Sequence, residues 1–192
     1  IELCDGVPSD VENNLDYWLN IVGRFCPWSG RIAKIGLSPS SSLTFKIKFQ
    51  GITSQKPSKT ANLTFRQANQ EKYRFENVGI VSDQNGIYTG RVADIAPGTY
   101  DLYLKGWAHL QKKFGNVTLN LGNNHQDLSG IILKAGDAIS NNRTDIYDYN
   151  KVVEHFGPRM PPEGSLADFD LDGDVDIFDY NYLVGNFGQV GD

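Results

Sequence analysis

Sulfur-containing residues, histidine and long apolar runs are scarce in this sequence. Among 192 residues there are two cysteines, one methionine and three histidines. No run of about 18 apolar residues occurs, so no transmembrane helix is predicted. Phosphate-binding loops, dinucleotide fingerprints, zinc patterns and nucleophile motifs are missing as well, and no carboxylate pair of the glycosidase type stands out. These absences favour a protein that is not an enzyme.

The two cysteines, Cys4 and Cys26, flank one short N-terminal segment. Such a pair is typical of a disulfide in an exported protein, and two buried thiols are the alternative. The chain begins at Ile1 rather than Met, which is typical of a processed protein or a fragment. We therefore expect an extracellular or cell-surface location.

Charge is distributed unevenly along the chain. The net charge is −5, but residues 137–192 hold 12 acidic and 3 basic residues, and residues 1–136 hold 11 acidic and 15 basic. This asymmetry indicates two modules. The acidic tail attracts cations and repels nucleic acid, so no nucleic-acid partner is expected.

Residues 1–42 are predicted to be an N-terminal segment with a short amphipathic helix. Ser9 and Glu12 have the spacing of a capping box. An apolar stripe at helical spacing follows the cap: Val11, Leu15, Trp18, Leu19 and Val22.

From Leu43 the apolar period changes from 3.6 to 2, which indicates strands. Glycine- and asparagine-containing turns separate the runs. The predicted strands are 43–49, 62–67, 72–81, 86–93, 98–105, 116–121 and 129–134. We predict a mainly β chain, with an antiparallel β-sandwich of the immunoglobulin or transthyretin type over residues 43–135 and a small α module after it.

One stretch of this region, residues 82–106, resembles the carboxypeptidase-regulatory-like and collagen-binding B-type sandwiches. The matching residues are Asp83, Gly86, Tyr88, Ile95, Pro97, Gly98, Tyr100 and Leu102. The resemblance implies a sandwich used as a spacer, stalk or accessory module. Some of these domains carry a Lys–Asn isopeptide crosslink, for which Lys46 or Lys48 would be the donor, although no pattern selects a partner.

The C-terminal part contains an internal repeat. Residues 136–157 align without gaps to residues 167–188, and a proline-rich linker separates the two copies. We treat residues 136–192 as one calcium-binding domain with two repeats.

The second copy has the spacing of a calcium loop. Calcium takes six to eight oxygen ligands, and a glycine at loop position 6 allows the sharp turn. The loop residues are Asp168, Asp170, Asp172, Gly173, Asp174, Asp176 and Asp179, at positions 1, 3, 5, 6, 7, 9 and 12. Asp174 would contribute its backbone carbonyl. The alternative, a solvated acidic loop, would leave six aspartates repelling one another. Val175 at position 8 is predicted to pair with its counterpart in the first copy.

The first copy is a poorer ligand set. Its candidates are Asp137, Asn141, Arg143 through its carbonyl, Asp145 and Asp148, at positions 1, 5, 7, 9 and 12. Ile139 at position 3 has no side-chain oxygen, and Asn142 replaces the glycine. We expect a weaker or water-completed second calcium site, with an empty loop as the alternative.

Both copies resemble the dockerin family across residues 136–188. An aspartate stands at position 12, and no convincing helix precedes the loop. The resemblance implies two loop–helix repeats, structural Ca²⁺ and a cohesin partner, with recognition positions at Ile146, Tyr147, Ile177 and Phe178. The helices are expected to pack together through Ile146, Tyr149, Val152, Val153 and Phe156 and through the equivalent Ile177, Tyr180, Leu183, Val184 and Phe187.

Three functions from different classes agree with these patterns. The first is a non-enzymatic, extracellular, calcium-binding structural or assembly protein of a prokaryotic cell surface, in its furthest form a filament subunit that joins head to tail with neighbouring subunits. The second is a dockerin that anchors a larger enzyme or adhesin to a cohesin. The third and most remote is a carbohydrate-binding accessory module using Trp18, Trp28 or Trp107.

Overall fold

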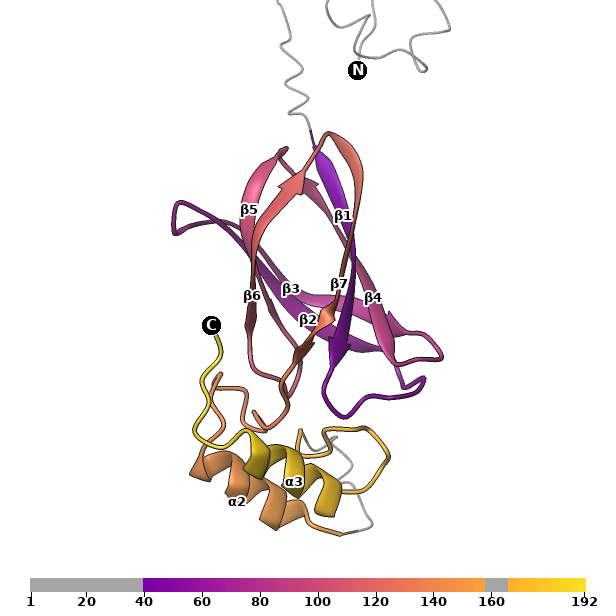
Figure 1. The fold of residues 1–192 in the computed structure, drawn as a ribbon, viewed down its shortest axis with the longest axis vertical. Helices are drawn as coiled ribbons and strands as arrows, with labels where there is room; N and C mark the ends of the chain where they lie inside the picture. Colours follow the sequence, from indigo (N-terminus) through magenta and orange to yellow (C-terminus); the bar gives the residue numbers. More distant parts are fainter. Residues whose placement is uncertain (1–39, 158–165) are drawn as a thin grey trace, which may run out of the picture. The chain divides into compact units, whose positions relative to one another are not determined.

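The computed structural model describes residues 40–157 and 166–192, which fall within one compact unit, Pro39–Asp192. The predicted N-terminal helix, Cys4, Cys26, Trp18 and Trp28 lie outside the described residues. Figure 1 shows strands followed by two short helices. The prediction of a mainly β chain with a small helical part is confirmed.

Each predicted strand is present, with shifts at several ends. The strands are β1 (Ser41–Phe49), β2 (Lys59–Gln67), β3 (Gln70–Ser82), β4 (Ile87–Ile95), β5 (Gly98–Lys105), β6 (Lys112–Leu119) and β7 (Gly122–Leu133). Strand β5 has its predicted bounds. Strands β6 and β7 begin earlier than predicted, because pairing with a neighbour continues through polar residues that have no apolar alternation: Lys112 pairs with Leu104, and Asn123 with Ser42.

The sheet is mixed, which corrects the prediction of an antiparallel sandwich. Its strands follow the order β6-β5-β2-β3-β4-β1-β7, and β1 and β7 run parallel while every other pair is antiparallel. Apolar alternation reports which face of a strand is buried. It carries no information on the direction of the neighbouring strand, so the sequence pattern left this feature undecided.

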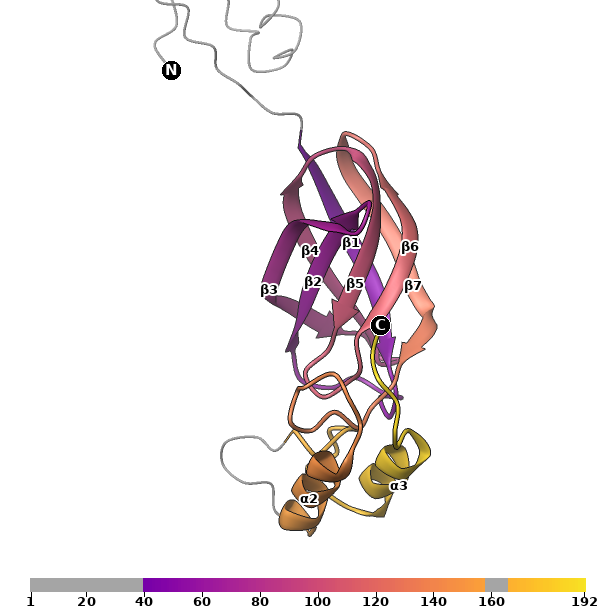
Figure 2. The ribbon, with the colours of Figure 1, turned by 90° about the vertical axis from the view of Figure 1, so that its left-hand side faces the viewer.

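The two halves of the sheet face each other across a common core. Strands β3 and β4 are joined only from Ile80 to Ser82, so the sheet turns at this narrow connection. Figures 1 and 2 show the strands wrapped around an interior. Phe45, Phe65 and Tyr88 are fully buried there. Burial of each such side chain stabilises the fold by about 1.5–3 kcal/mol.

The β3–β4 turn explains the first family resemblance in physical terms. Asp83 Oδ1 accepts hydrogen bonds from the amides of Asn85 (2.8 Å) and Ile87 (3.0 Å). Gly86 has φ +72°, and a Cβ there would lie 2.9 Å from Ile52, so only glycine fits. Tyr88 then enters the core. Neither candidate crosslink donor, Lys46 or Lys48, forms a hydrogen bond or ion pair with an asparagine or aspartate of the described ranges.

Two helices follow the strands, α2 (Ile146–His155) and α3 (Ile177–Gly185). Each begins with the same capping box: Asp145 and Asp176 accept from the backbone of the first turn, and Asp148 and Asp179 accept from the cap amide. The carboxylates that were predicted to bind an ion thus also fix where each helix begins.

Helix packing differs from the prediction. Val152 and Leu183 are fully buried, and the rings of Tyr149 and Tyr180 meet at 6.2 Å. The remaining members of the predicted apolar stripe are about half exposed: Ile146, Val153, Phe156, Ile177, Val184 and Phe187. The expectation that these six pack the repeats together is wrong, because each short helix turns only one narrow stripe toward the other.

Residues at the end of the β-structure contribute to the helical core. Ala108 and Ala135 are fully buried in one cluster with Val152, Phe169 and Leu183. The amides of Gly136 and Asp137 both donate to the carbonyl of Ala108, at 3.2 and 3.1 Å. The strands and the loop–helix pair are therefore packed against each other.

Candidate metal centre

The second loop gathers its first three aspartates. One carboxylate oxygen from each of Asp168, Asp170 and Asp172 lies within 4.8 Å of the others. Phe169 and Val175 are fully buried and anchor the loop on both sides. Alternation of aspartates with these apolar anchors turns the carboxylates toward one point.

Asp179 lies beneath this group, in the first turn of α3. Its Oδ1 accepts from the amide of Phe169 (2.6 Å), and its Oδ2 accepts from the amide of Asp176 (3.0 Å). Burial raises the pKa of the Asp179 carboxyl to about 7 and also raises the pKa values of Asp168 and Asp170. Negative charge on this cluster is therefore unfavourable unless a cation offsets it.

Asp168 provides the clearest sign that a group of this loop lacks a partner. Its side chain is almost fully buried, and its Oδ2 accepts from the amide of Gly173 at 3.2 Å. Its Oδ1 is buried and has no hydrogen-bond partner. A buried carboxylate oxygen without a donor is costly. A bound cation would satisfy it, so the residues of this loop fit Ca²⁺, which prefers oxygen ligands.

The other predicted ligands of the second loop have mixed roles. Asp172 Oδ1 accepts from the amide of Asp174, and Asp170 Oδ1 accepts from the amide of Asp172. Asp176 caps helix α3 by accepting from the amide of Phe178 at 2.7 Å. Gly173 has φ +106°, as the predicted sharp turn requires.

The first loop is different at the equivalent of Asp168. Both oxygens of the fully buried Asp137 are occupied, because Oδ1 accepts from the amide of Asn141 (2.8 Å) and Oδ2 from that of Asn142 (2.9 Å). Oδ2 also forms an ion pair with the ammonium group of Lys105. This lysine comes from the end of β5 and had no place in the predicted ligand set.

The remaining first-loop candidates are held by backbone contacts. Asn141 Oδ1 accepts from the amide of Arg143 at 2.9 Å, and Asp145 caps α2. Asp148 accepts from the amides of Ile139 (3.0 Å) and Asp145 (2.8 Å), and burial raises its pKa. The side chain of Ile139 lies partly exposed at position 3.

The predicted pairing of Val175 with its counterpart Thr144 is wrong. Val175 forms a two-way backbone bridge with Gly157, with N···O distances of 2.9 and 3.3 Å. Thr144 instead pairs with Gly188 and Gln189 (2.8 and 2.9 Å). Each loop is therefore bound to the residues that follow the other repeat's helix, because the chain turns back there to close the pair.

The β-structure also touches the second loop, which sequence reasoning missed. Lys56 donates a hydrogen bond from Nζ to the carbonyl of Leu171 at 2.9 Å. A Cβ added to Gly51 would lie 3.0 Å from the Cβ of Asp170. Both contacts join segments more than 100 positions apart, so no local pattern signals them.

Comparisons with known proteins give a fold likeness and one partial family match. One family model, which describes an N-terminal domain, matches residues 1–37. No curated protein matches the chain. Within the described ranges, no helix is long and apolar enough to cross a membrane.

Among solved structures, the chain is similar to two mutants of a type II cohesin–X–dockerin complex from Acetivibrio cellulolyticus. A chain of the C-terminal interface mutant has 20% identity and a TM-score of 0.52, with 79% of this chain and 97% of that chain covered. The N-terminal interface mutant has 18% identity, a TM-score of 0.49 and the same coverage. A candidate carbohydrate-binding protein from Bacteroides uniformis has 14% identity and a TM-score of 0.32, with 51% and 43% covered. The first of these shows a shared fold.

Proposed function

We propose that this chain is a non-enzymatic, extracellular assembly protein whose loop–helix pair is dockerin-like and binds a cohesin-like domain of another protein. A calcium ion in the second loop holds the binding surface in shape. The observation that carries this proposal is a duplicated set of exposed apolar side chains on the two helices.

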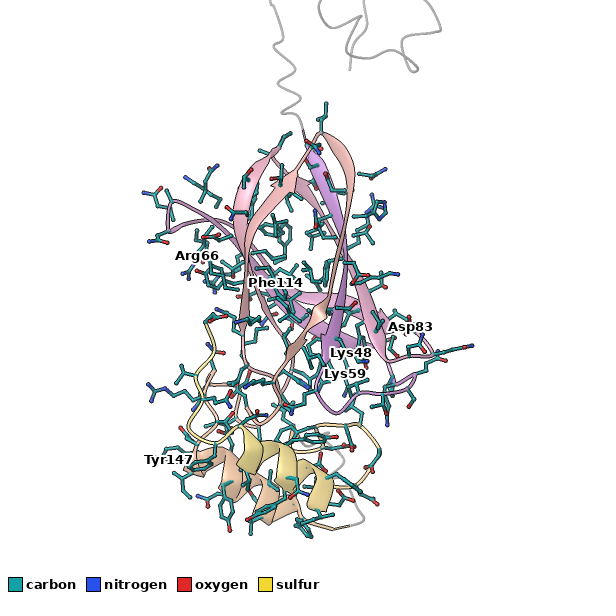
Figure 3. The ribbon with its side chains drawn as sticks, in the orientation of Figure 1. Lys48, Lys59, Arg66, Asp83, Phe114 and Tyr147 are labelled. Carbon is teal, nitrogen blue, oxygen red and sulfur yellow. The ribbon has the colours of Figure 1, made fainter. Side chains whose placement is uncertain are left out.

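These side chains form what we call the paired-helix surface. Its members are between 49% and 64% exposed, and each residue of one repeat has a counterpart of nearly equal exposure in the other. The pairs are Ile146 and Ile177, Tyr147 and Phe178, Val153 and Val184, and Phe156 and Phe187. Figure 3 shows Tyr147 on the helix pair, away from the strands. Clustered exposed apolar residues on a soluble protein mark interaction sites.

The duplication favours a protein partner over a small ligand. Ile146 and Val153 lie two turns apart on one side of α2, and Ile177 and Val184 have the same spacing on α3. A surface made of two helices and rich in aromatic residues fits the buried centre of a protein interface. It includes the four positions at which the dockerin resemblance places partner recognition.

The fold likeness supports the same assignment. The match to the cohesin–X–dockerin complex covers 79% of this chain, whereas residues 1–135 make up only 135 of its 192 residues. The matched region therefore reaches into the loop–helix pair and includes more than the strands.

Calcium in the second loop follows from the unpaired buried oxygen of Asp168 and the concentration of aspartates around it. Its role would be structural, because each loop sets the start of a helix that carries the surface. The carbohydrate-binding alternative has less support: Trp107 packs against Phe49 (ring centroids 4.6 Å apart) and Tyr88 (5.7 Å) and so belongs to the core.

A capture experiment tests the proposal. The immobilised chain is incubated with extracellular proteins of its native organism, with calcium or with a chelator, and bound proteins are identified by mass spectrometry. We expect calcium-dependent capture of a protein with a cohesin-like sandwich, and loss of capture in the Val153→Asp/Val184→Asp double variant.

Val81→Asp provides the matched control, because Val81 is an equally exposed valine on strand β3. Capture that survives in the double variant, or is lost equally in the control, would contradict the proposed surface. Calcium-dependent polymers of the pure protein, seen by light scattering, would instead support the filament alternative.

A further inference from the structure

The two loops descend from one repeated sequence, yet their first aspartates have different surroundings. Asp168 has a buried oxygen without a partner, and Asp137 has none. The difference comes from outside the repeat, because the side chain that completes Asp137 belongs to Lys105 in strand β5.

Lys105 is held in place by two acceptors. Its Nζ forms the ion pair with Asp137 and also donates to the carbonyl of His109 at 3.1 Å. The lysine side chain is 14% exposed and that of Asp137 is fully buried. The flexible lysine stem is thus fixed with its charge directed at the loop, which distinguishes it from a surface ion pair.

We propose that the Lys105 ammonium is the permanent cation of the first loop, so that this loop needs no calcium and the protein binds one calcium ion rather than two. This inference rests on the proposed calcium site of the second loop.

Two physical effects act together to exclude an ion from the first loop. A divalent ion near Asp137 would be repelled by the buried ammonium, and displacing that ammonium would leave a lysine without its partner. Ile139 also offers no oxygen at position 3, so an entering ion would gain fewer ligands than in the second loop.

The inference makes the two halves of the paired-helix surface unequal in calcium-free medium. The first loop and the start of α2 stay anchored to strand β5 through Lys105. The second loop keeps only its backbone contacts around an uncompensated acidic cluster. We expect hydrogen exchange in chelator to accelerate at residues 168–176 and to change little at residues 137–145.

Titration calorimetry on the full chain, with calcium chloride as the probe, tests the stoichiometry. The wild type is expected to bind one ion. Ile139→Asp alone supplies the missing ligand but should still bind one, because Lys105 remains. The Ile139→Asp/Lys105→Met double variant should bind two. Lys56→Met, which removes the lysine at the second loop's carbonyl, is the control and should bind one.

The outcomes separate this inference from the proposed calcium site. No binding to the wild type would refute the calcium site itself. Two ions in the wild type, or two in Ile139→Asp with Lys105 present, would refute the role of Lys105 while leaving the second loop's calcium intact. The exchange experiment uses only the wild type, so it decides the question even where the double variant does not fold.

Discussion

Asn186, the residue that caps the end of helix α3, donates a 2.7 Å hydrogen bond from Nδ2 to Oε1 of Gln50, the residue after strand β1. The same Nδ2 donates to the carbonyl of Ala135 (2.8 Å), and Gln50 Oε1 accepts from the amide of Ala135 (3.1 Å). Three segments distant in sequence therefore meet at one buried junction between the strands and the helices.

Replacement of Asn186 by alanine should destabilise the whole described unit. Both hydrogen bonds of the buried Nδ2 are lost and their acceptors are left without this donor, which costs about 1–3 kcal/mol. Chemical denaturation measures the change. Gln189→Ala removes an exposed hydrogen bond to Lys134 and should cost less than about 0.5 kcal/mol. Equal effects of the two variants would contradict the junction.

Calcium removal should lower the melting temperature. At free calcium a hundred times the dissociation constant, binding stabilises the folded state by about 2.7 kcal/mol. A chelator abolishes this contribution in the wild type, and Asp168→Asn should show no further loss with chelator. Asp83→Asn, in the β3–β4 turn, should respond as the wild type does. Thermal unfolding with and without chelator provides the comparison.

Gly51→Ala should weaken calcium binding from a position outside the loop. Its φ is +90°, and the new Cβ would press on Asp170 at 3.0 Å. Gly122→Ala is a matched control, because Gly122 has φ +88° and open space around it. Both variants carry the backbone strain of about 1–2 kcal/mol. Only Gly51→Ala should lower the calcium affinity measured by calorimetry, and a similar loss in both would refute the contact.

Acidification should destabilise the fold through His109. Burial lowers the pKa of this fully buried histidine from 6.5 to about 3, while its Nε2 lies 3.1 Å from the carbonyl of Gln50. The unfolded chain therefore binds more protons than the folded one below pH 6.5, so stability falls as pH decreases from about 6.5 toward 3.

Between pH 7 and pH 5 this histidine should account for a loss of about 2 kcal/mol. Denaturant titrations at several pH values measure the slope. His109→Gln retains a side-chain donor but does not titrate, so its stability should depend less on pH. Identical slopes for variant and wild type would show that the imidazole is not responsible.

The sequence by itself determined the features that depend on near neighbours. The alternation of Leu43, Phe45 and Ile47 defined which face of β1 is buried, and the structure agrees. The duplicated aspartate spacing located both loops and both helix starts, because capping needs only residues within one turn.

Only the tertiary structure decided how distant segments complete these local units. It placed β7 parallel to β1, left Val153 and Val184 exposed, and paired Val175 with Gly157. It also brought Lys105 to Asp137, so that two loops with one ancestral pattern acquired different partners. Periodicity and spacing specify which side chains share a face or a turn, but the cation that neutralises a buried carboxylate is set by the packing of the whole unit.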